Sequence, residues 1–129
     1  MSALFSCRQV GDVVIVDASG RITLGEGSTA LREQIQKLVY GRPLKPWDVD
    51  IPPSKKVNIL LNLGDVSYMD SSGLGGLICV FSTVTNAGGM LKLLSLCKRV
   101  QDLLEITDLY TDFEVFDDEA AAISSFARH

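Results

Sequence analysis

The chain has 129 residues, of which 47% are hydrophobic and 22% are charged, and its formal net charge is −4. This length and composition suit one globular domain with a hydrophobic core of its own. The mild acidity gives no basic surface for nucleic acid and favours a basic protein partner only weakly.

Membrane insertion and zinc binding are not expected. No apolar stretch approaches the roughly 18 residues that a membrane span needs, and Arg8 and Asp12 interrupt the segment in which a signal peptide would lie. The cysteines, Cys7, Cys79 and Cys97, have no C-x-x-C spacing, which argues against a zinc site and fits a reducing cytoplasm. Cys79 and Cys97 lie in apolar runs and are expected in the core.

The N-terminal part of the chain predicts a β-hairpin. Residues 5–9 form a short strand, Gly11 and Asp12 suit the tip of a tight turn, and residues 13–18 are rich in valine and isoleucine. Ser19 and Gly20 are expected to end this second strand.

A helix is predicted next, over residues 29–39, where apolar side chains recur at helical spacing. Ser28 or Thr29 is its expected N-cap. Tyr40 and Gly41 are expected to close it, since glycine adopts the left-handed conformation common at helix ends.

The segment 41–56 predicts a long surface loop. It holds all four prolines and the single tryptophan, Trp47, and neither a regular helix nor a central strand tolerates so much proline. Loops of this length are uncommon and often functional. Trp47 either rests on the domain's own surface or is presented to a partner as an interface anchor.

The second half of the chain alternates strands and helices. The predicted elements are a near-continuously apolar central strand at 57–63, a helix at 72–85, a strand at 90–96, a helix at 98–107, a strand at 113–116, and a last helix that ends at Phe126 and is capped by Asp117 or Asp118. The order ββαβαβαβα predicts an α/β fold with a mixed, mostly parallel sheet and helices packed against it.

A short motif marks the junction between the central strand and the helix after it. Its residues are Met69, Asp70, Ser71, Ser72, Gly73, Leu74 and Gly75. A helix start has free backbone N–H groups and a partial positive charge, which favour a negative group. Ser71 or Ser72 is expected to cap the helix, and Asp70 to accept backbone N–H groups. A serine at this position also suits reversible phosphorylation.

Glycines are concentrated in the first turns of the same helix. Gly73, Gly75 and Gly76 would each cost about 1 kcal/mol relative to alanine in an isolated helix. We expect them to allow close packing; the alternative is a flat surface for docking.

Residues 65–75 resemble the signature of the STAS domain family, the bacterial anti-sigma factor antagonists. The resemblance continues through a turn at 86–89 and a helix start at 98–100, and it covers nearly the whole chain except the segment 41–56. It implies one STAS domain over residues 1–129, with a proline-rich insertion loop at 41–56.

The resemblance also implies a function. Ser71 would be the phosphorylated serine, with Ser72 as a minor alternative, and the partner-binding residues would be Asp70, Ser72, Gly73, Leu74, Gly75 and Thr23. The unphosphorylated protein would bind an anti-sigma factor serine kinase and free a sigma factor, and a PP2C-type phosphatase would restore the serine. Together with the cysteines, the charge and the hydropathy described above, this predicts a cytoplasmic protein with no cofactor and no direct contact with nucleic acid or membrane. An antagonist is expected to be a monomer or dimer.

One position departs from the family pattern. The family commonly has an aspartate where Thr23 stands, in a loop close to the phosphorylated serine. By the family pattern, this substitution puts the pairing with the kinase in question, and Glu26 is a candidate substitute for the missing carboxylate.

Enzymatic chemistry finds little support in the sequence. The single histidine is the last residue, His129, Ser71 lacks the G-x-S-x-G nucleophile elbow, and the chain has no P-loop motif. The alternatives to an antagonist are a STAS subunit of a larger signalling scaffold, a STAS module that senses a small molecule and, with least support, a serine hydrolase.

Overall fold

A computed structural model describes residues 3–45, 47–48, 52, 56–107 and 113–127 of the chain. The elements in chain order are β1 (Leu4–Val10), β2 (Val13–Ile22), α1 (Glu26–Tyr40), β3 (Asn58–Met69), α2 (Ser71–Asn86), β4 (Met90–Leu96), α3 (Lys98–Ile106), β5 (Val115–Phe116) and α4 (Glu119–Ala127). This order confirms the predicted ββαβαβαβα arrangement.

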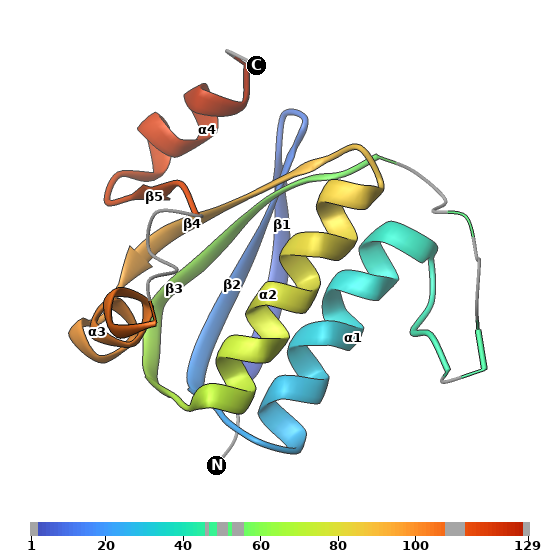
Figure 1. The fold of residues 1–129 in the computed structure, drawn as a ribbon. Coiled ribbons are helices and arrows are strands. Elements are labelled where there is room, and N and C mark those ends of the chain that lie inside the picture. Colours follow the sequence, from blue (N-terminus) through green and yellow to red (C-terminus); the bar gives the residue numbers. More distant parts are fainter. Residues whose placement is uncertain (1–2, 46, 49–51, 53–55, 108–112, 128–129) are drawn as a thin grey trace.

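The strands form one sheet in the order β1-β2-β3-β4-β5. β1 pairs with β2 in the antiparallel sense through a hairpin whose tip includes Gly11, which has a φ of 59°. The pairs β2–β3, β3–β4 and β4–β5 are parallel. The sheet is therefore mixed and mostly parallel, as predicted (Figure 1).

Both faces of the sheet are covered, which explains the near-continuous apolar run of the central strand. Ile59 and Leu61 point into the main core with residues of α1 and α2, whereas Leu60 points to a second core with Ala122 and Phe126 of α4. Adjacent residues of a strand face opposite sides of a sheet, so a strand buried on both faces has no polar alternation. Figure 1 shows α1 and α2 side by side on one face.

β2 and β3 are longer than the sequence indicated. The prediction that β2 ends at Ser19 and Gly20 and that β3 ends at residue 63 was wrong, because the two strands remain paired up to Ile22 and Met69. The register shifts twice along this extension, and Gly20 has a φ of 93°. The extension thus contains bulges, whose polar and glycine residues resemble strand ends in the sequence.

α1 starts earlier than predicted and ends as predicted. Its N-cap is Gly25, without a side-chain cap, so Ser28 and Thr29 lie inside the helix. Gly41 closes it in the left-handed conformation with a φ of 82°, and its N–H donates to the carbonyl of Lys37 at 3.0 Å.

The connection from α1 to β3 contains no helix or strand among its described residues. Asp48 organises this part: its carboxylate accepts the Lys45 N–H at 2.7 Å and pairs with Arg42 at 2.9 Å. Trp47 is 75% exposed. It therefore does not rest on the domain's own surface. Residues 46, 49–51 and 53–55 of the predicted loop lie outside the described residues.

The cysteines are free and lie nearer the surface than predicted. Cys79 is exposed and Cys97 is half-buried, so the prediction of two core cysteines was wrong. Cys79 follows the buried Leu77 by two residues, and this separation turns it towards the outer side of α2.

Sequence reasoning did not identify the buried lysine of the second core. Lys92 is only 1% exposed. Its Nζ donates to the hydroxyl of Ser125 at 2.8 Å, lies 3.2 Å from the carboxylate of Glu114, and lies 4.7 Å from the centroid of the Phe126 ring. Within the described residues no buried side-chain nitrogen or oxygen lacks a partner, so the lysine forms a satisfied link between β4 and α4.

A matched pair of substitutions will separate the packing of Lys92 from its charge. We expect Lys92→Ala to destabilise the fold by about 2–5 kcal/mol, as for other large core truncations. Lys92→Met keeps the stem and should cost less than about 1.5 kcal/mol, because Glu114 is half-exposed and stays hydrated. Urea unfolding at neutral pH measures both.

Lys56→Ala is the control, because Lys56 is exposed and surface changes usually stay within about 0.5 kcal/mol. Equal destabilisation by Lys92→Met and Lys92→Ala would show that the ammonium group, and not the stem, stabilises the contact between α4 and the sheet.

Candidate functional site

The candidate site lies where β3 passes into α2. Asp70, between the two elements, has an extended backbone with φ −98° and ψ −175°, and its side chain accepts the Gly73 N–H at 2.8 Å. Asp70 is therefore the N-cap of α2. The prediction that Ser71 or Ser72 caps the helix was wrong, and the prediction that Asp70 accepts backbone N–H groups is confirmed.

The same carboxylate also holds the connection between β2 and α1. Its second oxygen accepts the Leu24 N–H at 3.1 Å. The backbone N–H of Asp70 in turn donates to the carbonyl of Ile22 at 3.4 Å. One aspartate thus fixes the start of α2 against the β2–α1 connection, which contains Thr23.

These hydrogen bonds favour the ionised form of Asp70. The N–H of Gly73 contributes most to holding the pKa of the Asp70 carboxyl below its usual value, and the N–H groups of Leu24 and Ser72 add to it, while desolvation opposes the shift. Hydrogen bonds donated to a carboxylate favour its charged form. The helix start therefore carries a fixed negative charge beside Ser71.

Glycine allows the helix start to approach this connection closely. A Cβ atom on Gly73 would lie 2.1 Å from the carbonyl oxygen of Ile22, and one on Gly76 would lie 2.8 Å from Oγ of Ser28. A Cβ on Gly75 would meet nothing within 4 Å. The packing prediction is confirmed for Gly73 and Gly76, whereas Gly75 lies on the open side of the helix.

The two serines of the motif have different surroundings. Ser71 is the exposed first residue of α2, and no group among the described residues hydrogen-bonds its hydroxyl. Ser72 is half-buried, and its carbonyl accepts the hydroxyl of Ser28 at 3.2 Å. Ser71 therefore presents the accessible hydroxyl, whereas Ser72 is held against α1.

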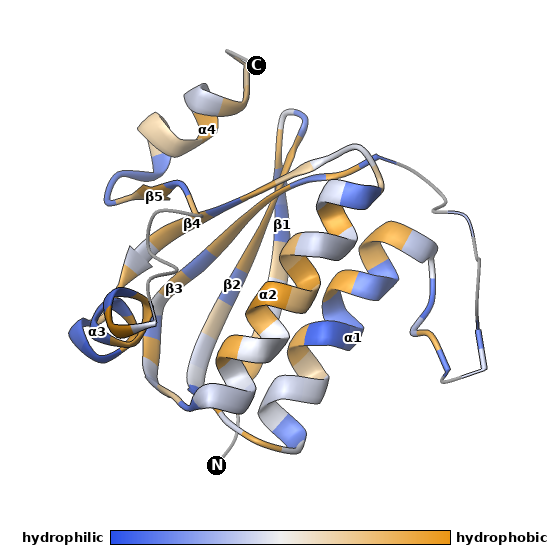
Figure 2. Cartoon of the chain, viewed as in Figure 1, coloured by the Kyte–Doolittle hydropathy of each residue, from blue (hydrophilic) through white to orange (hydrophobic). Residues whose placement is uncertain are grey.

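The exposed side of α2 carries no charge. The helix sequence SSGLGGLICVFSTVTN contains neither acidic nor basic residues, although 22% of the whole chain is charged. Its exposed residues are Ser71, Gly75, Ile78, Cys79, Ser82, Thr85 and Asn86. Figure 2 shows most of α2 in white and orange, in contrast to the blue positions of α1. We call these seven residues the neutral face of α2.

The remaining residues predicted for partner binding surround this helix start. Leu74 is buried beneath it, and Thr23 is half-buried with its carbonyl accepting the Ser28 N–H at 3.0 Å. Glu26 lies exposed in the first turn of α1. Sequence reasoning missed Leu24, which is 77% exposed although apolar. An isolated leucine between Thr23 and Gly25, outside any periodic pattern, was the available signal.

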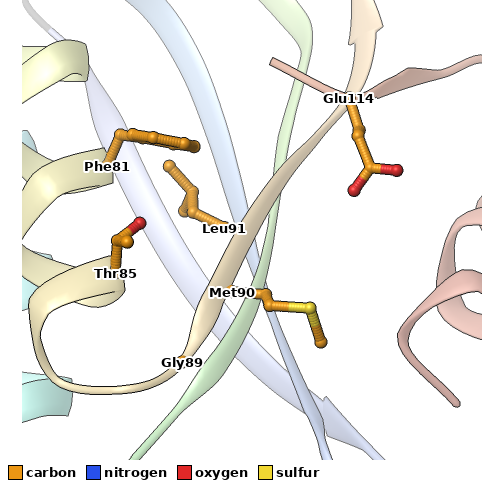
Figure 3. A pocket seen from close by; sticks show the side chains of 6 residues that line it. All are labelled: Phe81, Thr85, Gly89, Met90, Leu91 and Glu114. Atoms are coloured by element: carbon orange, nitrogen blue, oxygen red, sulfur yellow. The ribbon is translucent and has the colours of Figure 1, made fainter. Parts of the chain in front are cut away.

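Three further observations on the described chain bear on other kinds of site. A pocket of about 180 Å³ between α2 and β4 is lined by Phe81, Thr85, Gly89, Met90, Leu91 and Glu114 (Figure 3). Phe81 and Thr85 lie in the second half of α2, away from Ser71. Among the described residues no His, Cys, Asp or Glu side chains form a group able to hold a metal ion. No described helix is long and apolar enough to span a membrane. The single histidine of the sequence, His129, lies outside the described residues.

Comparison of the sequence with known proteins identifies a family. The sequence matches the STAS domain family over residues 5–122. It is 51% identical over 71 residues to the anti-sigma-B factor antagonist of Bacillus subtilis, an alignment that spans 55% of this chain and 65% of that relative.

The fold is also that of solved structures of anti-sigma factor antagonists. The unphosphorylated form of SpoIIAA matches with a TM-score of 0.72 and 18% identity over 98% of both chains. The phosphorylated form of the Bacillus protein SpoIIAA matches with a TM-score of 0.64 and 17% identity, over 95% of this chain and 98% of the other. These two structures confirm the predicted fold.

The two glycines of the helix start should respond in opposite ways to the same substitution. We expect Gly73→Ala to destabilise the fold by about 1–3 kcal/mol, since the new methyl group collides with backbone. Gly75→Ala should stabilise it by about 0.5–1 kcal/mol, because alanine is the better helix former and the space is open. Urea unfolding tests the pair, and losses of equal size would contradict the packing described here.

The charge of Asp70 should make stability depend on pH. Because the pKa of Asp70 is lowered in the folded state, its contribution is complete above the unfolded value of about 4 and is lost as the pH falls through the folded value. We expect Asp70→Asn to be less stable at pH 7 by about 1–2 kcal/mol, because an amide has one oxygen and leaves either the Gly73 or the Leu24 N–H without its acceptor. This difference should shrink in acid. Denaturant unfolding from pH 7 down to about pH 3 measures this, and a constant difference would refute it.

Proposed function

This chain belongs to the STAS domain family, and from that premise we propose that it is an anti-sigma factor antagonist switched by phosphorylation of Ser71. In its unphosphorylated form it binds an anti-sigma factor that is also a serine kinase, and the sigma factor is released. The observation that carries this proposal is the exposed hydroxyl of Ser71 at the start of a helix whose outer face is neutral.

The position of Ser71 suits transfer of a phosphoryl group. The kinase would transfer the γ-phosphoryl group of ATP to Oγ of Ser71, which loses its proton, and ADP would leave. A PP2C-type phosphatase would later hydrolyse the ester with water and restore the hydroxyl. Because Asp70 and not Ser71 caps the helix, neither step removes a hydrogen bond that holds the fold.

The electrostatics of the helix start support a switch that acts on binding. A phosphoserine carries about −1.5 to −2 charges at neutral pH, and the positive end of the α2 dipole tolerates this charge within the folded protein. In a docked interface the same charge would have to lose its water beside the ionised Asp70. A penalty of about 3 kcal/mol would weaken binding roughly a hundredfold.

The neutral face of α2 supports the choice of docking surface. Ile78 lies about two helical turns beyond Ser71 and on the same side, since seven residues complete almost two turns, and it is 39% exposed. Gly75 lies between them without a side chain. Together with the exposed Leu24 near the helix start, these residues form an uncharged, partly apolar surface with few protruding side chains. A partner can cover this surface without removing water from a charged group.

The β2–α1 connection would complete the partner surface. Thr23 stands where the family commonly has an aspartate, and Glu26 in the first turn of α1 is the nearest acidic residue along the chain. We expect Glu26 to supply the carboxylate for a basic residue of the kinase. The other residues predicted for partner binding at the helix start would contribute by positioning Ser71; they are Asp70, Ser72, Gly73 and Leu74.

A phosphate-transfer experiment tests the proposal. The chain is incubated with ATP and each serine kinase encoded near its gene, and mass spectrometry locates the modified residue. We expect phosphate on Ser71, retained in Ser72→Ala and lost in Ser71→Ala. The two variants are matched because they remove the same hydroxyl from neighbouring positions.

The binding arm of the same experiment measures the switch. The unphosphorylated chain should bind its kinase at least about a hundredfold more tightly than the phosphorylated chain, if the penalty is about 3 kcal/mol. Equal affinity of the two forms would overturn the switch. A folded chain that no candidate kinase modifies would favour the scaffold or small-molecule alternatives, and size measurement and ligand-dependent melting distinguish these two.

A further inference from the structure

Two arginines from different elements contact one tyrosine, Tyr68, near the carboxyl end of β3. Ser71 lies just beyond the same end of this strand. The guanidinium carbon of Arg21, at the end of β2, lies 4.7 Å from the centroid of the Tyr68 ring. The guanidinium carbon of Arg99, in the first turn of α3, lies 5.2 Å from the same centroid. The ring is half-buried and both arginines are exposed, so the tyrosine is a platform that holds two positive charges at the surface.

These arginines have no carboxylate partner among the described residues. Two other arginines of the chain do: Arg8 pairs with Asp17 and Glu119, and Arg42 pairs with Asp48. Two like charges held on one ring repel each other, and the ring face compensates only in part, since an exposed cation–π contact contributes about 0.5–1 kcal/mol. The cluster is therefore suited to a negative group from outside.

The cluster borders the phosphorylation site. Arg21 pairs with Tyr68 in the parallel ladder, the next pair is Ile22 with Met69, and Asp70 follows and donates its N–H to the Ile22 carbonyl. α3 begins directly after β4. Arg21, Tyr68 and Arg99 thus lie at or just after the carboxyl ends of the neighbouring strands β2, β3 and β4. Open α/β sheets bind their ligands at this end of the strands, and Figure 1 shows the start of α3 beside it.

We propose that Arg21 and Arg99, held on Tyr68, form a docking point for a carboxylate side chain of the kinase that binds at Ser71. This inference rests on the proposed function and names a second contact of the same partner. A guanidinium group binds a carboxylate through two parallel hydrogen bonds. The chain as a whole has a net charge of −4, so a local pair of positive charges gives an acidic partner residue one favoured place to bind.

The cluster would complement the neutral face of α2. The neutral face supplies contact area that has little dependence on salt, whereas charges at an interface rim govern orientation and the rate of association. A carboxylate at Arg21 and Arg99 would fix how the kinase lies over α2 and would bring its active site to Ser71. The cluster is a positioning contact and takes no part in phosphoryl transfer.

Steady-state phosphorylation of Ser71 by the kinase identified above tests the docking point. We expect Arg21→Gln and Arg99→Gln each to raise KM about three- to fivefold, as for the loss of one exposed charge pair. The double variant should raise it about tenfold and leave kcat unchanged. KM of the wild type should also increase between 50 and 300 mM salt, and this increase should be smaller for the double variant.

Two controls separate this role from folding and from overall charge. Lys56→Gln removes one positive charge from the exposed residue before β3, at the opposite end of that strand, and should leave KM unchanged. Arg99→Lys keeps the charge but lacks the planar fork, and should recover part of the loss. Urea midpoints of all variants should remain close to that of the wild type, since both arginines are exposed.

The outcomes distinguish this inference from the proposed function. If the wild type is phosphorylated on Ser71 and the double variant has the same KM and salt dependence, the docking point is wrong and the switch stands. If Lys56→Gln raises KM as much as Arg99→Gln, the effect is one of net charge and the docking point is again wrong. If no kinase modifies the wild type, the proposed function fails and this inference fails with it.

Discussion

The candidate site depends on two hydrogen bonds that the carboxylate of Asp70 accepts. One oxygen accepts the Gly73 N–H at the start of α2 and the other accepts the Leu24 N–H in the β2–α1 connection. The helix start can approach this connection because Gly73 has no side chain to collide with the Ile22 carbonyl. These two features place the end of β3, the start of α2 and the connection that contains Thr23 in one fixed arrangement, and Ser71 is left at its surface.

Asp70 caps the helix, and the hydroxyl of Ser71 makes no hydrogen bond to any residue that the structure describes. A serine that capped the helix itself would lose that hydrogen bond, or change its geometry, each time a phosphoryl group was added. Here the modification would change the charge of the surface by about −1.5 to −2 and leave the cap intact. In this proposal the cap that holds the fold and the serine that would be modified are adjacent but separate residues, Asp70 and Ser71.

The sequence predicted the fold well because the central strands β3 and β4 are largely buried and the strands and helices alternate along the chain. The apolar run at 57–63 identified the central strand, and Gly41 identified the end of α1. The errors have local causes. The bulged extension of β2 beyond Gly20 resembles a strand end, and Asp70 and Ser71 are both good caps on propensity alone. Lys92 could not be predicted as buried, since its partners Glu114 and Ser125 are distant in sequence and meet it only in the folded chain.

The proposed docking point gives phosphorylation a second effect on binding. Arg21 and Arg99 together carry two positive charges, and the phosphoryl group on Ser71 would add a negative charge of nearly the same size at the same edge of the sheet. It would therefore cancel much of the local positive potential that attracts a carboxylate of the kinase, besides adding the cost of removing water from the phosphate itself. The first effect weakens with salt because exposed charges are screened, whereas the second persists because it arises inside the interface. The salt dependence of binding to the phosphorylated and unphosphorylated chain thus resolves the two contributions: the affinity ratio should fall with salt and level off well above one.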